Sequence, residues 1–145
     1  MPGPLGGITV LDLSWILSGP FCTMLLADQG AEVIKVERPG IGDGARGTGP
    51  FVSYPGTAGD DGGQESAYFI SINRNKKSIV LDLRRDHDKD VFRRLAAQVD
   101  VVAENFAPGT LERLGLDWDV LKAVNPRIVL ARIKGFGTYG PYSDF

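Results

Sequence analysis

Short apolar runs rich in branched residues alternate along this chain with segments in which apolar residues recur at helical spacing. The apolar runs predict five buried strands at residues 8–13, 31–37, 78–83, 99–104 and 127–133. Helical spacing predicts helices at residues 20–29, 86–98, 110–114 and 118–124, and a short helix or turn at residues 66–72. Polar segments predict a long loop at residues 39–64 and a turn at residues 73–77. Alternating strands and helices predict an α/β fold with a doubly wound, mostly parallel, Rossmann-like sheet.

The first three predicted elements form one strand-helix-strand unit of the length that a parallel crossover requires. In its helix, Phe21, Met24 and Leu25 recur at helical intervals. Pro20 suits the first turn of this helix, and Gly30 ends it. Such a unit fixes the handedness of the sheet and the edge at which a ligand binds.

Two glycine-rich segments match G-x-G-x-x-G, the pattern that cradles a pyrophosphate in dinucleotide-binding proteins. The first, at residues 42–47, is followed by Thr-Gly-Pro, whereas the dinucleotide motif requires a helix at that point. The second, at residues 135–140, is followed by a proline. The loop after the first strand contains only Gly19, so we do not expect NAD binding.

Length, composition and charge restrict the class of protein. With 43% hydrophobic and 23% charged residues, residues 1–145 fit one globular domain. The formal net charge of −2 argues against nucleic-acid binding, and no apolar run approaches the ~20 residues of a membrane span. The single cysteine, Cys22, fits a reducing compartment, and the first residues lack the features of a signal peptide, so a cytoplasmic protein is expected.

The residues that follow the predicted strands are expected at one edge of the sheet, where open parallel sheets bind ligands. They include the cations Arg38, Arg84 and Lys134 and the ring of Phe106, with Arg113 nearby in sequence. Guanidinium groups pair with phosphates and an aromatic ring can cover a base, so the set predicts a site for a phosphorylated, adenine-bearing cofactor. For any single cation, pairing with a neighbouring carboxylate is the commoner arrangement. The hypothesis therefore depends on the whole set.

No catalytic or metal-binding group can be assembled from the sequence. Asp12 and Asp82 lie within predicted strands and are interpreted as anchors for neighbouring loops. Cys22, on an apolar helix, is expected to be buried, and His87 is expected on a helix surface. With one histidine, neither a Ser-His-Asp set nor a metal-ligand spacing is available.

Several segments together resemble the N-terminal part of the class III coenzyme A transferases, the family of formyl-CoA transferase, carnitine CoA-transferase and α-methylacyl-CoA racemase. The resemblance covers nearly the whole chain and is carried by residues 7–13, 19–28, 30–40, 73–79, 104–109, 125–127 and 134–137. It implies binding of coenzyme A or an acyl-CoA at Ile16, Leu17, Ser18, Arg38, Leu81, Asp82, Leu83, Arg84, Asn105, Phe106, Ala107 and Arg113. These positions largely coincide with the strand-end set, to which Lys134 also belongs.

The resemblance also implies a reaction. In this family an aspartate takes the acyl group from an acyl-CoA thioester as a mixed anhydride and then forms an aspartyl-CoA thioester, so that CoA passes to a carboxylic acid. That aspartate, the acid-base pair of the racemases and a second domain all lie beyond Phe145 in the family. We therefore expect little or no turnover from residues 1–145 alone. The long loop before Glu65 favours a transferase over a racemase. Leu17 replaces the glutamine of formyl-CoA transferases, which leaves the acid open.

Three alternatives stay open: an acyl-CoA racemase-type member of the family, a non-catalytic CoA-binding fragment or subunit, and a truncated product without a function of its own. The resemblance implies an interlocked homodimer. A five-stranded sheet without the segment that covers it in the family is expected to expose apolar surface and to dimerise or aggregate.

Overall fold

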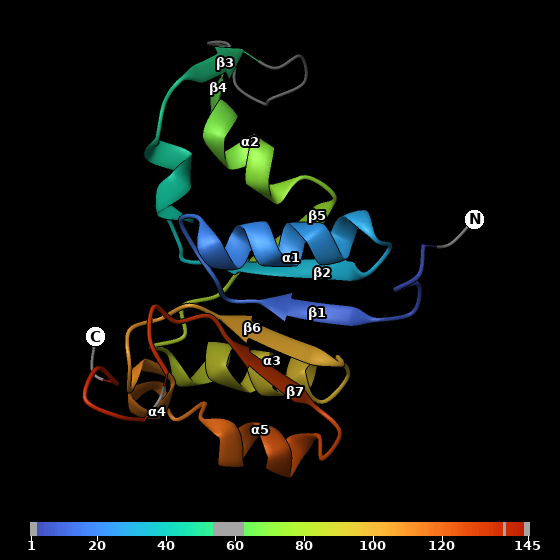
Figure 1. Ribbon diagram of the computed structural model, residues 1–145, viewed down its shortest axis with the longest axis vertical. Helices are drawn as coiled ribbons and strands as arrows, with labels where there is room; N and C mark the ends of the chain where they lie inside the picture. The colour runs from blue at the N-terminus through green and yellow to red at the C-terminus, as the bar shows by residue number, and fades with distance from the viewer. Residues whose placement is uncertain (1–2, 54–62, 138, 144–145) are drawn as a thin grey trace.

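The computed structural model describes residues 3–53, 63–137 and 139–143. Its strands and helices follow one another as β1 (Thr9–Asp12), α1 (Ser18–Asp28), β2 (Glu32–Glu37), η1 (Gly44–Gly47), β3 (Phe51–Ser53), β4 (Gln64–Ser66), α2 (Ala67–Asn73), β5 (Lys76–Val80), α3 (Asp86–Ala96), β6 (Val101–Glu104), α4 (Thr110–Leu114), α5 (Trp118–Val124) and β7 (Val129–Arg132). Five strands form a parallel sheet, and β3 pairs with β4 in a separate antiparallel sheet (Figure 1). None of the helices described in these ranges is long and apolar enough to cross a membrane.

The order of strands in the parallel sheet is β5-β2-β1-β6-β7, so the chain extends the sheet first to one side of β1 and then to the other. Asp12, at the end of β1, is level with Lys35 of β2 and with Ala103 of β6. The connections after β1 and β6 lead to helices on opposite faces, which opens a crevice at the carboxyl ends of these two strands. This order confirms the predicted doubly wound, Rossmann-like sheet.

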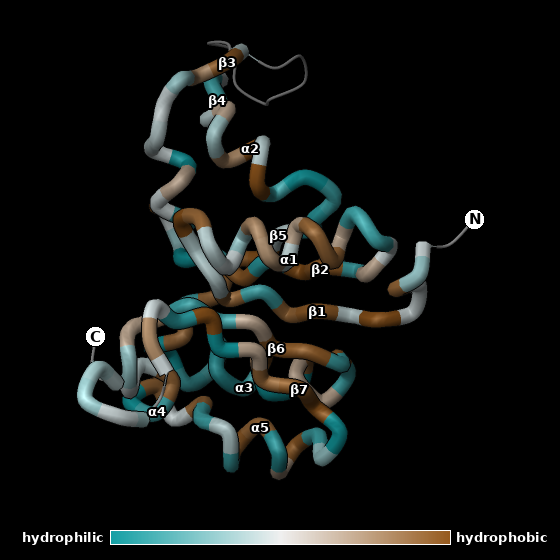
Figure 2. Tube along the Cα trace, viewed as in Figure 1, coloured by the Kyte–Doolittle hydropathy of each residue, from teal (hydrophilic) through white to brown (hydrophobic). Residues whose placement is uncertain are grey.

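Two buried apolar layers, one on each face of the sheet, hold the fold together. Successive residues of β1 point to opposite faces. Val10 packs in one layer with Ala27 of α1, and Leu11 packs in the other with Phe92 of α3 and Leu121 of α5. Figure 1 shows α1 beside β1 and β2, and α3 and α5 beside β6 and β7; Figure 2 shows hydrophobic positions along these strands. Because both faces are covered, strands of this sheet appear in the sequence as nearly continuous apolar runs.

The prediction of the third strand at residues 78–83, after a turn at residues 73–77, is wrong by two to three residues. The observed strand β5 begins at Lys76 and starts with two lysines, which an apolar pattern does not select. The side chain of Lys76 is only 2% exposed, and its ammonium group lies 3.0 Å from the carboxylate of Asp12. Because the strand ends early, Asp82 lies in the loop that follows it and not within a strand.

The segment predicted as a long loop has regular structure in its described part, and residues 54–62 lie outside the described residues. It contains η1 and β3, and its last residue, Gln64, is the first of β4. All three residues of β3 are exposed, so this strand lacks the alternation of apolar and polar positions that identifies a half-buried strand. The ambiguous segment at residues 66–72 forms the helix α2. Ser66 caps this helix by accepting the N–H of Phe69 at 3.0 Å.

Helix α1 does not bury its largest apolar residues. Phe21 and Leu25 are 48% and 44% exposed, and Cys22, predicted to be buried, is exposed as well. The helix lies so close to the loop after β1 that a Cβ atom at Gly19 would be 2.2 Å from the Cβ of Ser14. Mostly small residues therefore occupy the face that packs on the sheet, and the buried residues of α1 are Gly19, Pro20, Thr23, Met24 and Ala27.

Candidate functional site

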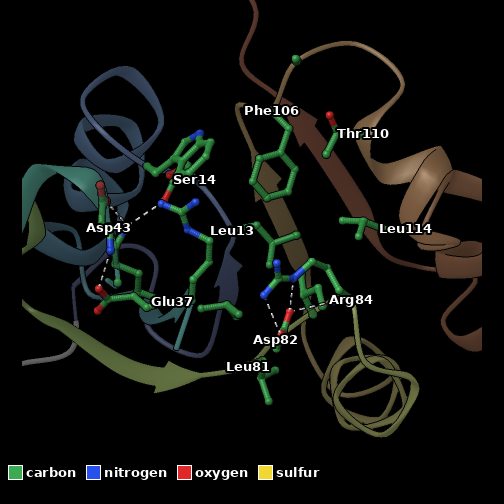
Figure 3. Close-up of a pocket in the computed structure, with 17 residues that line it drawn as sticks. Leu13, Ser14, Glu37, Asp43, Leu81, Asp82, Arg84, Phe106, Thr110 and Leu114 are labelled. Atoms are coloured by element: carbon green, nitrogen blue, oxygen red, sulfur yellow. Dashed lines mark hydrogen bonds and ion pairs between the residues drawn. The ribbon is translucent and has the colours of Figure 1, made fainter. Parts of the chain in front are cut away.

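A pocket of about 330 Å³ opens at the carboxyl ends of the parallel strands (Figure 3). It is lined by the segments that follow β1, β5 and β6, by the last residues of β2 and the loop after it, and by α4. The lining residues are those at 13–15, 35–38, 42–43, 81–84 and 106–107, with Thr110 and Leu114. The pocket lies where the strand order reverses, which is the ligand site of open α/β sheets.

The floor of this pocket is apolar. Leu13, Val36 and Leu81 belong to the buried core, and Phe106 and Leu114 pack against it. In Figure 3 the labelled Phe106 and Leu114 lie on the side of the opening away from Asp43 and Glu37. An apolar floor with few polar groups suits a ligand that has a flat or aliphatic body and charged substituents.

Two of the three cations that line the pocket are paired with carboxylates. Lys35 and Asp43 are each 1% exposed, and their charged atoms lie 2.8 Å apart. Arg84 donates to Asp82 through Nε at 2.8 Å and through Nη2 at 3.0 Å. These hydrogen bonds from Arg84 lower the pKa of Asp82 to about 2. The buried Lys35–Asp43 pair holds both of its side chains in place. The Arg84 side chain is 83% exposed, so its pairing with Asp82 offsets only part of its charge.

Arg38 is the third lining cation, and within the part of the chain that the structure describes its guanidinium group has no hydrogen bond or ion pair. The guanidinium carbon lies 4.4 Å from the centre of the Trp15 ring. A guanidinium group that stacks on an indole keeps its N–H groups directed outward in its own plane. Arg38 is therefore the lining cation whose charge no described carboxylate offsets, and its donors are available to an anionic group such as a phosphate.

Trp15 is held by two neighbours from the segment after β6. The Phe106 and Trp15 rings meet edge to face, with centroids 6.0 Å apart and planes at 86°. The side-chain amide of Asn105 bonds to both backbone groups of Trp15: the Trp15 N–H donates to Oδ1 at 3.0 Å, and Nδ2 donates to the Trp15 carbonyl at 2.8 Å. Residues some 90 positions apart are thereby joined across the crevice.

The loop after β1 has an unusual backbone that polar contacts stabilise. Ile16 has φ 70, in the left-handed region that β-branched residues rarely adopt, at a cost of roughly 1–3 kcal/mol. The Ile16 N–H donates to Asp43 Oδ1 at 2.9 Å, and the Ser14 carbonyl accepts from Lys35 Nζ at 2.7 Å. The buried carboxylate of Asp12 accepts from the N–H of Ser14 at 2.9 Å, which agrees with its interpretation as an anchor. The Lys35–Asp43 pair thus fixes the shape of this loop.

Comparison with known proteins decides the family. The sequence matches CoA-transferase family III over residues 5–145. The chain belongs to this family. It is 48% identical over 143 residues to an acyl-CoA transferase of Fusarium pseudograminearum, a match that covers 97% of the chain and 30% of that protein. It is 43% identical over 143 residues to an acetyl-CoA:oxalate CoA-transferase of Acetobacter aceti, with 99% of the chain and 34% of that protein covered.

Solved structures agree with this assignment to family III. A CAIB/BAIF family protein from Brucella suis superposes with a TM-score of 0.89 at 43% identity, covering 99% of the chain and 36% of that structure. A hypothetical protein from Mycobacterium tuberculosis gives a TM-score of 0.84 at 40% identity, and the match covers 99% of the chain and 37% of that structure. The predicted resemblance to the class III transferases is confirmed, and the chain spans about a third of the length of the curated relatives it matches.

The structure brings together about half of the residues that the family resemblance implies for CoA. Arg38, Leu81, Asp82, Leu83, Arg84, Phe106 and Ala107 line the pocket. Ile16, Leu17 and Ser18 are exposed beside it, and the amide of Asn105 faces the backbone of Trp15.

Arg113 and Lys134 are engaged elsewhere. Arg113 donates to Thr110 Oγ1 at 2.8 Å, within α4. Lys134 lies 2.9 Å from the buried carboxylate of Glu104 and donates to the Phe106 carbonyl. It lines a neighbouring pocket of about 260 Å³.

The sequence did not single out Trp15, Lys35 or Asp43 as parts of the site. Trp15 lies in the segment that follows the first predicted strand, so the strand-end argument included it without giving it a role. A lysine inside an otherwise apolar strand was an available signal for Lys35, because such a residue is buried only with a partner. Among the described residues, no group of three or more histidines, cysteines and carboxylates is arranged to hold a metal ion, and His87 is exposed as expected.

Proposed function

We propose that this stretch of chain is the CoA-binding part of a family III CoA-transferase and that the pocket at the strand ends holds the body of coenzyme A. The observation that carries the proposal is Arg38, a cation with available donors at the edge of an apolar pocket. The apolar floor suits the base or the pantetheine chain, and the guanidinium group suits a phosphate. The names of the two curated relatives given above, an acyl-CoA transferase and an acetyl-CoA:oxalate CoA-transferase, favour transfer over racemisation.

We propose the family's anhydride route for the whole enzyme. An aspartate that corresponds to a position beyond Phe145 attacks the thioester carbonyl of an acyl-CoA, which forms a mixed anhydride and expels the CoA thiolate. The thiolate then attacks the aspartyl carbonyl, which releases the first acid and leaves an aspartyl-CoA thioester. The second acid attacks that thioester, which forms a second mixed anhydride and expels the CoA thiolate again. The thiolate then attacks the acyl carbonyl of this anhydride, which forms the new acyl-CoA and frees the aspartate.

In this sequence of steps CoA leaves and returns as a thiolate twice. A site that keeps the rest of the molecule bound between steps makes each return effectively intramolecular. The proposed contribution of residues 1–145 is this retention, and we expect little or no transferase turnover from them alone. The acid substrate is not assigned, because the relatives' names include both oxalate and D-citramalate and Leu17 differs from the glutamine of formyl-CoA transferases.

Calorimetric titration of the 145-residue protein with CoA tests the proposal, with Arg38→Ala as the variant. Loss of a charge-assisted contact is expected to weaken binding about 10- to 100-fold. Arg127→Ala is the matched control, because Arg127 is an exposed arginine just before β7, at the opposite edge of the sheet. Dephospho-CoA in place of CoA shows whether the 3′-phosphate contributes. Failure of the intact protein to bind CoA, or equal affinities of Arg38→Ala and Arg127→Ala, contradicts the assignment.

A further inference from the structure

The resemblance implies that Asn105 contacts CoA directly, but its side chain is already occupied. Both ends of the amide bond to the backbone of Trp15, at 3.0 and 2.8 Å. The fit is close, since a Cβ atom at Gly19 would lie 3.3 Å from Asn105 Cγ. An amide used in this way sets the position of its neighbour and not the position of a ligand.

The backbone around Trp15 leaves this residue little freedom. The carbonyl before it accepts from the buried Lys35, and the N–H after it donates to the buried Asp43. Ile16 is held in a left-handed conformation with φ 70. A conformation of this kind persists only where the surroundings determine it, and such positions concentrate at functional sites.

The Trp15 side chain in turn supports Arg38. The guanidinium carbon of Arg38 lies 4.4 Å from the Trp15 ring centre, and this stacking is its one described side-chain interaction. Phe106 also contacts the indole, edge to face. An exposed arginine without such support would sample many rotamers, and ordering them on binding would weaken affinity.

We propose that Asn105 and Trp15 are positioning residues that act on the cofactor through Arg38. Asn105 fixes the Trp15 backbone, the Trp15 ring holds the Arg38 guanidinium group over the pocket, and Arg38 meets a phosphate of CoA. This inference depends on the proposed function for its ligand, but the first two links exist without ligand. It separates residues that the family resemblance groups as one kind of contact.

The first test measures, without ligand, whether the Asn105 amide holds Trp15 in place. Trp118→Phe leaves Trp15 as the only tryptophan, because the chain has two. In this background Asn105→Ala is expected to shift the Trp15 emission to the red, since the loop loosens and the indole meets more water. Asn125→Ala is the matched control: Asn125 also bonds backbone carbonyls, those of Ala96 and Val99, at the other edge of the sheet. Unchanged Trp15 emission in Asn105→Ala contradicts the proposal that Asn105 positions Trp15.

The second test is a double-mutant cycle on CoA affinity, with folding of each variant checked by circular dichroism. Asn105→Ala and Trp15→Leu are each expected to weaken CoA binding about three- to tenfold, and Trp15→Phe less, because it retains a ring. If both residues act through Arg38, adding either substitution to Arg38→Ala produces no further loss. If the affinity losses of the single variants multiply in the double variants, the proposal that Asn105 and Trp15 act through Arg38 is wrong, but the proposed function is not affected. Absence of CoA binding by the intact protein overturns the proposed function and, with it, CoA as the ligand that Arg38 contacts.

Discussion

Glu37, at the end of β2, joins the central sheet to the long connection that follows it. Arg46 donates to its two carboxylate oxygens at 2.7 and 2.8 Å, and Ser78 donates at 2.6 Å from the neighbouring strand. Its carboxylate also accepts the N–H of Asp43 at 3.0 Å. Burial alone would raise the pKa of Glu37, but these hydrogen bonds outweigh it and lower the pKa from 4.5 to about 2. One carboxylate thus holds the segment that supplies Asp43 to the site.

The low pKa of Glu37 predicts a pH-dependent stability. A carboxyl group whose pKa is lower in the folded state than in the unfolded state stabilises the fold above its ordinary pKa, and this contribution is lost as the pH falls toward the folded value. At 1.36 kcal/mol per pKa unit, the lowering corresponds to at most about 3 kcal/mol. Glu37→Gln is therefore expected to reduce the free energy of unfolding at neutral pH and to flatten its decline between about pH 4.5 and about pH 2.

Urea unfolding at a series of pH values measures this effect. Glu32→Gln serves as the control, because Glu32 is 49% exposed and pairs with Lys77, which is 71% exposed. Exposed ion pairs of this kind contribute little, so the control is expected to lose less than about 1 kcal/mol. Equal pH profiles for the two variants would show that the contacts of Glu37 do not stabilise the fold.

At the scale of elements, the apolar pattern located all five strands of the parallel sheet, with β5 displaced by two to three residues, and missed the exposed β3 and its partner β4. β1, β2, β6 and β7 lie within the predicted apolar runs. β5 starts with Lys76 and Lys77, whose charges are satisfied by partners from other elements, so local sequence does not mark them as strand residues. The position of the site at the carboxyl edge of the sheet could be predicted from the alternation of strands and helices. The Asn105–Trp15 and Lys35–Asp43 contacts did not, because they join separate segments whose meeting depends on the finished fold.

Helix α4 gives a prediction at this scale, because it carries Thr110 and Leu114 of the pocket and ends at Gly115 with φ 67. The N–H of the next residue, Leu116, bonds back to Leu111 at 3.0 Å, which closes the helix end. Nothing lies within 4 Å of a Cβ atom built at Gly115, so Gly115→Ala meets only the conformational cost of a left-handed residue, about 1–2 kcal/mol.

Gly47→Ala is the matched control for this helix end. A Cβ atom at Gly47 also has open space, and its backbone is outside the left-handed region. Its free energy of unfolding is expected to change by less than about 0.5 kcal/mol or to rise slightly. Chemical denaturation of both variants compares the two sites, and an equal loss at each would show that backbone conformation is not the cause.

At the scale of the whole molecule, the surface of the described chain has apolar side chains that no element covers. Phe21 and Leu25 of α1 are 48% and 44% exposed, and Leu17, the residue directly before this helix, is 50% exposed. Phe21 and Leu25 are four residues apart and therefore lie on the same side of the helix. Together with Leu17 at the start of the helix they are called the apolar stripe. Exposed apolar surface of this kind favours association. We expect the 145-residue protein to self-associate in a concentration-dependent way.

Sedimentation velocity over a range of protein concentrations measures this association, and Phe21→Lys identifies the surface responsible. A lysine at the centre of the stripe keeps an aliphatic stem but adds a charge whose burial in an interface is unfavourable. The variant is expected to shift the distribution toward monomer. Val124→Lys is the control, since Val124 is 37% exposed on α5, on the opposite side of the sheet. A protein that stays monomeric at every concentration contradicts the prediction, and an equal shift in both variants would mean that added charge, and not the stripe on α1, controls association.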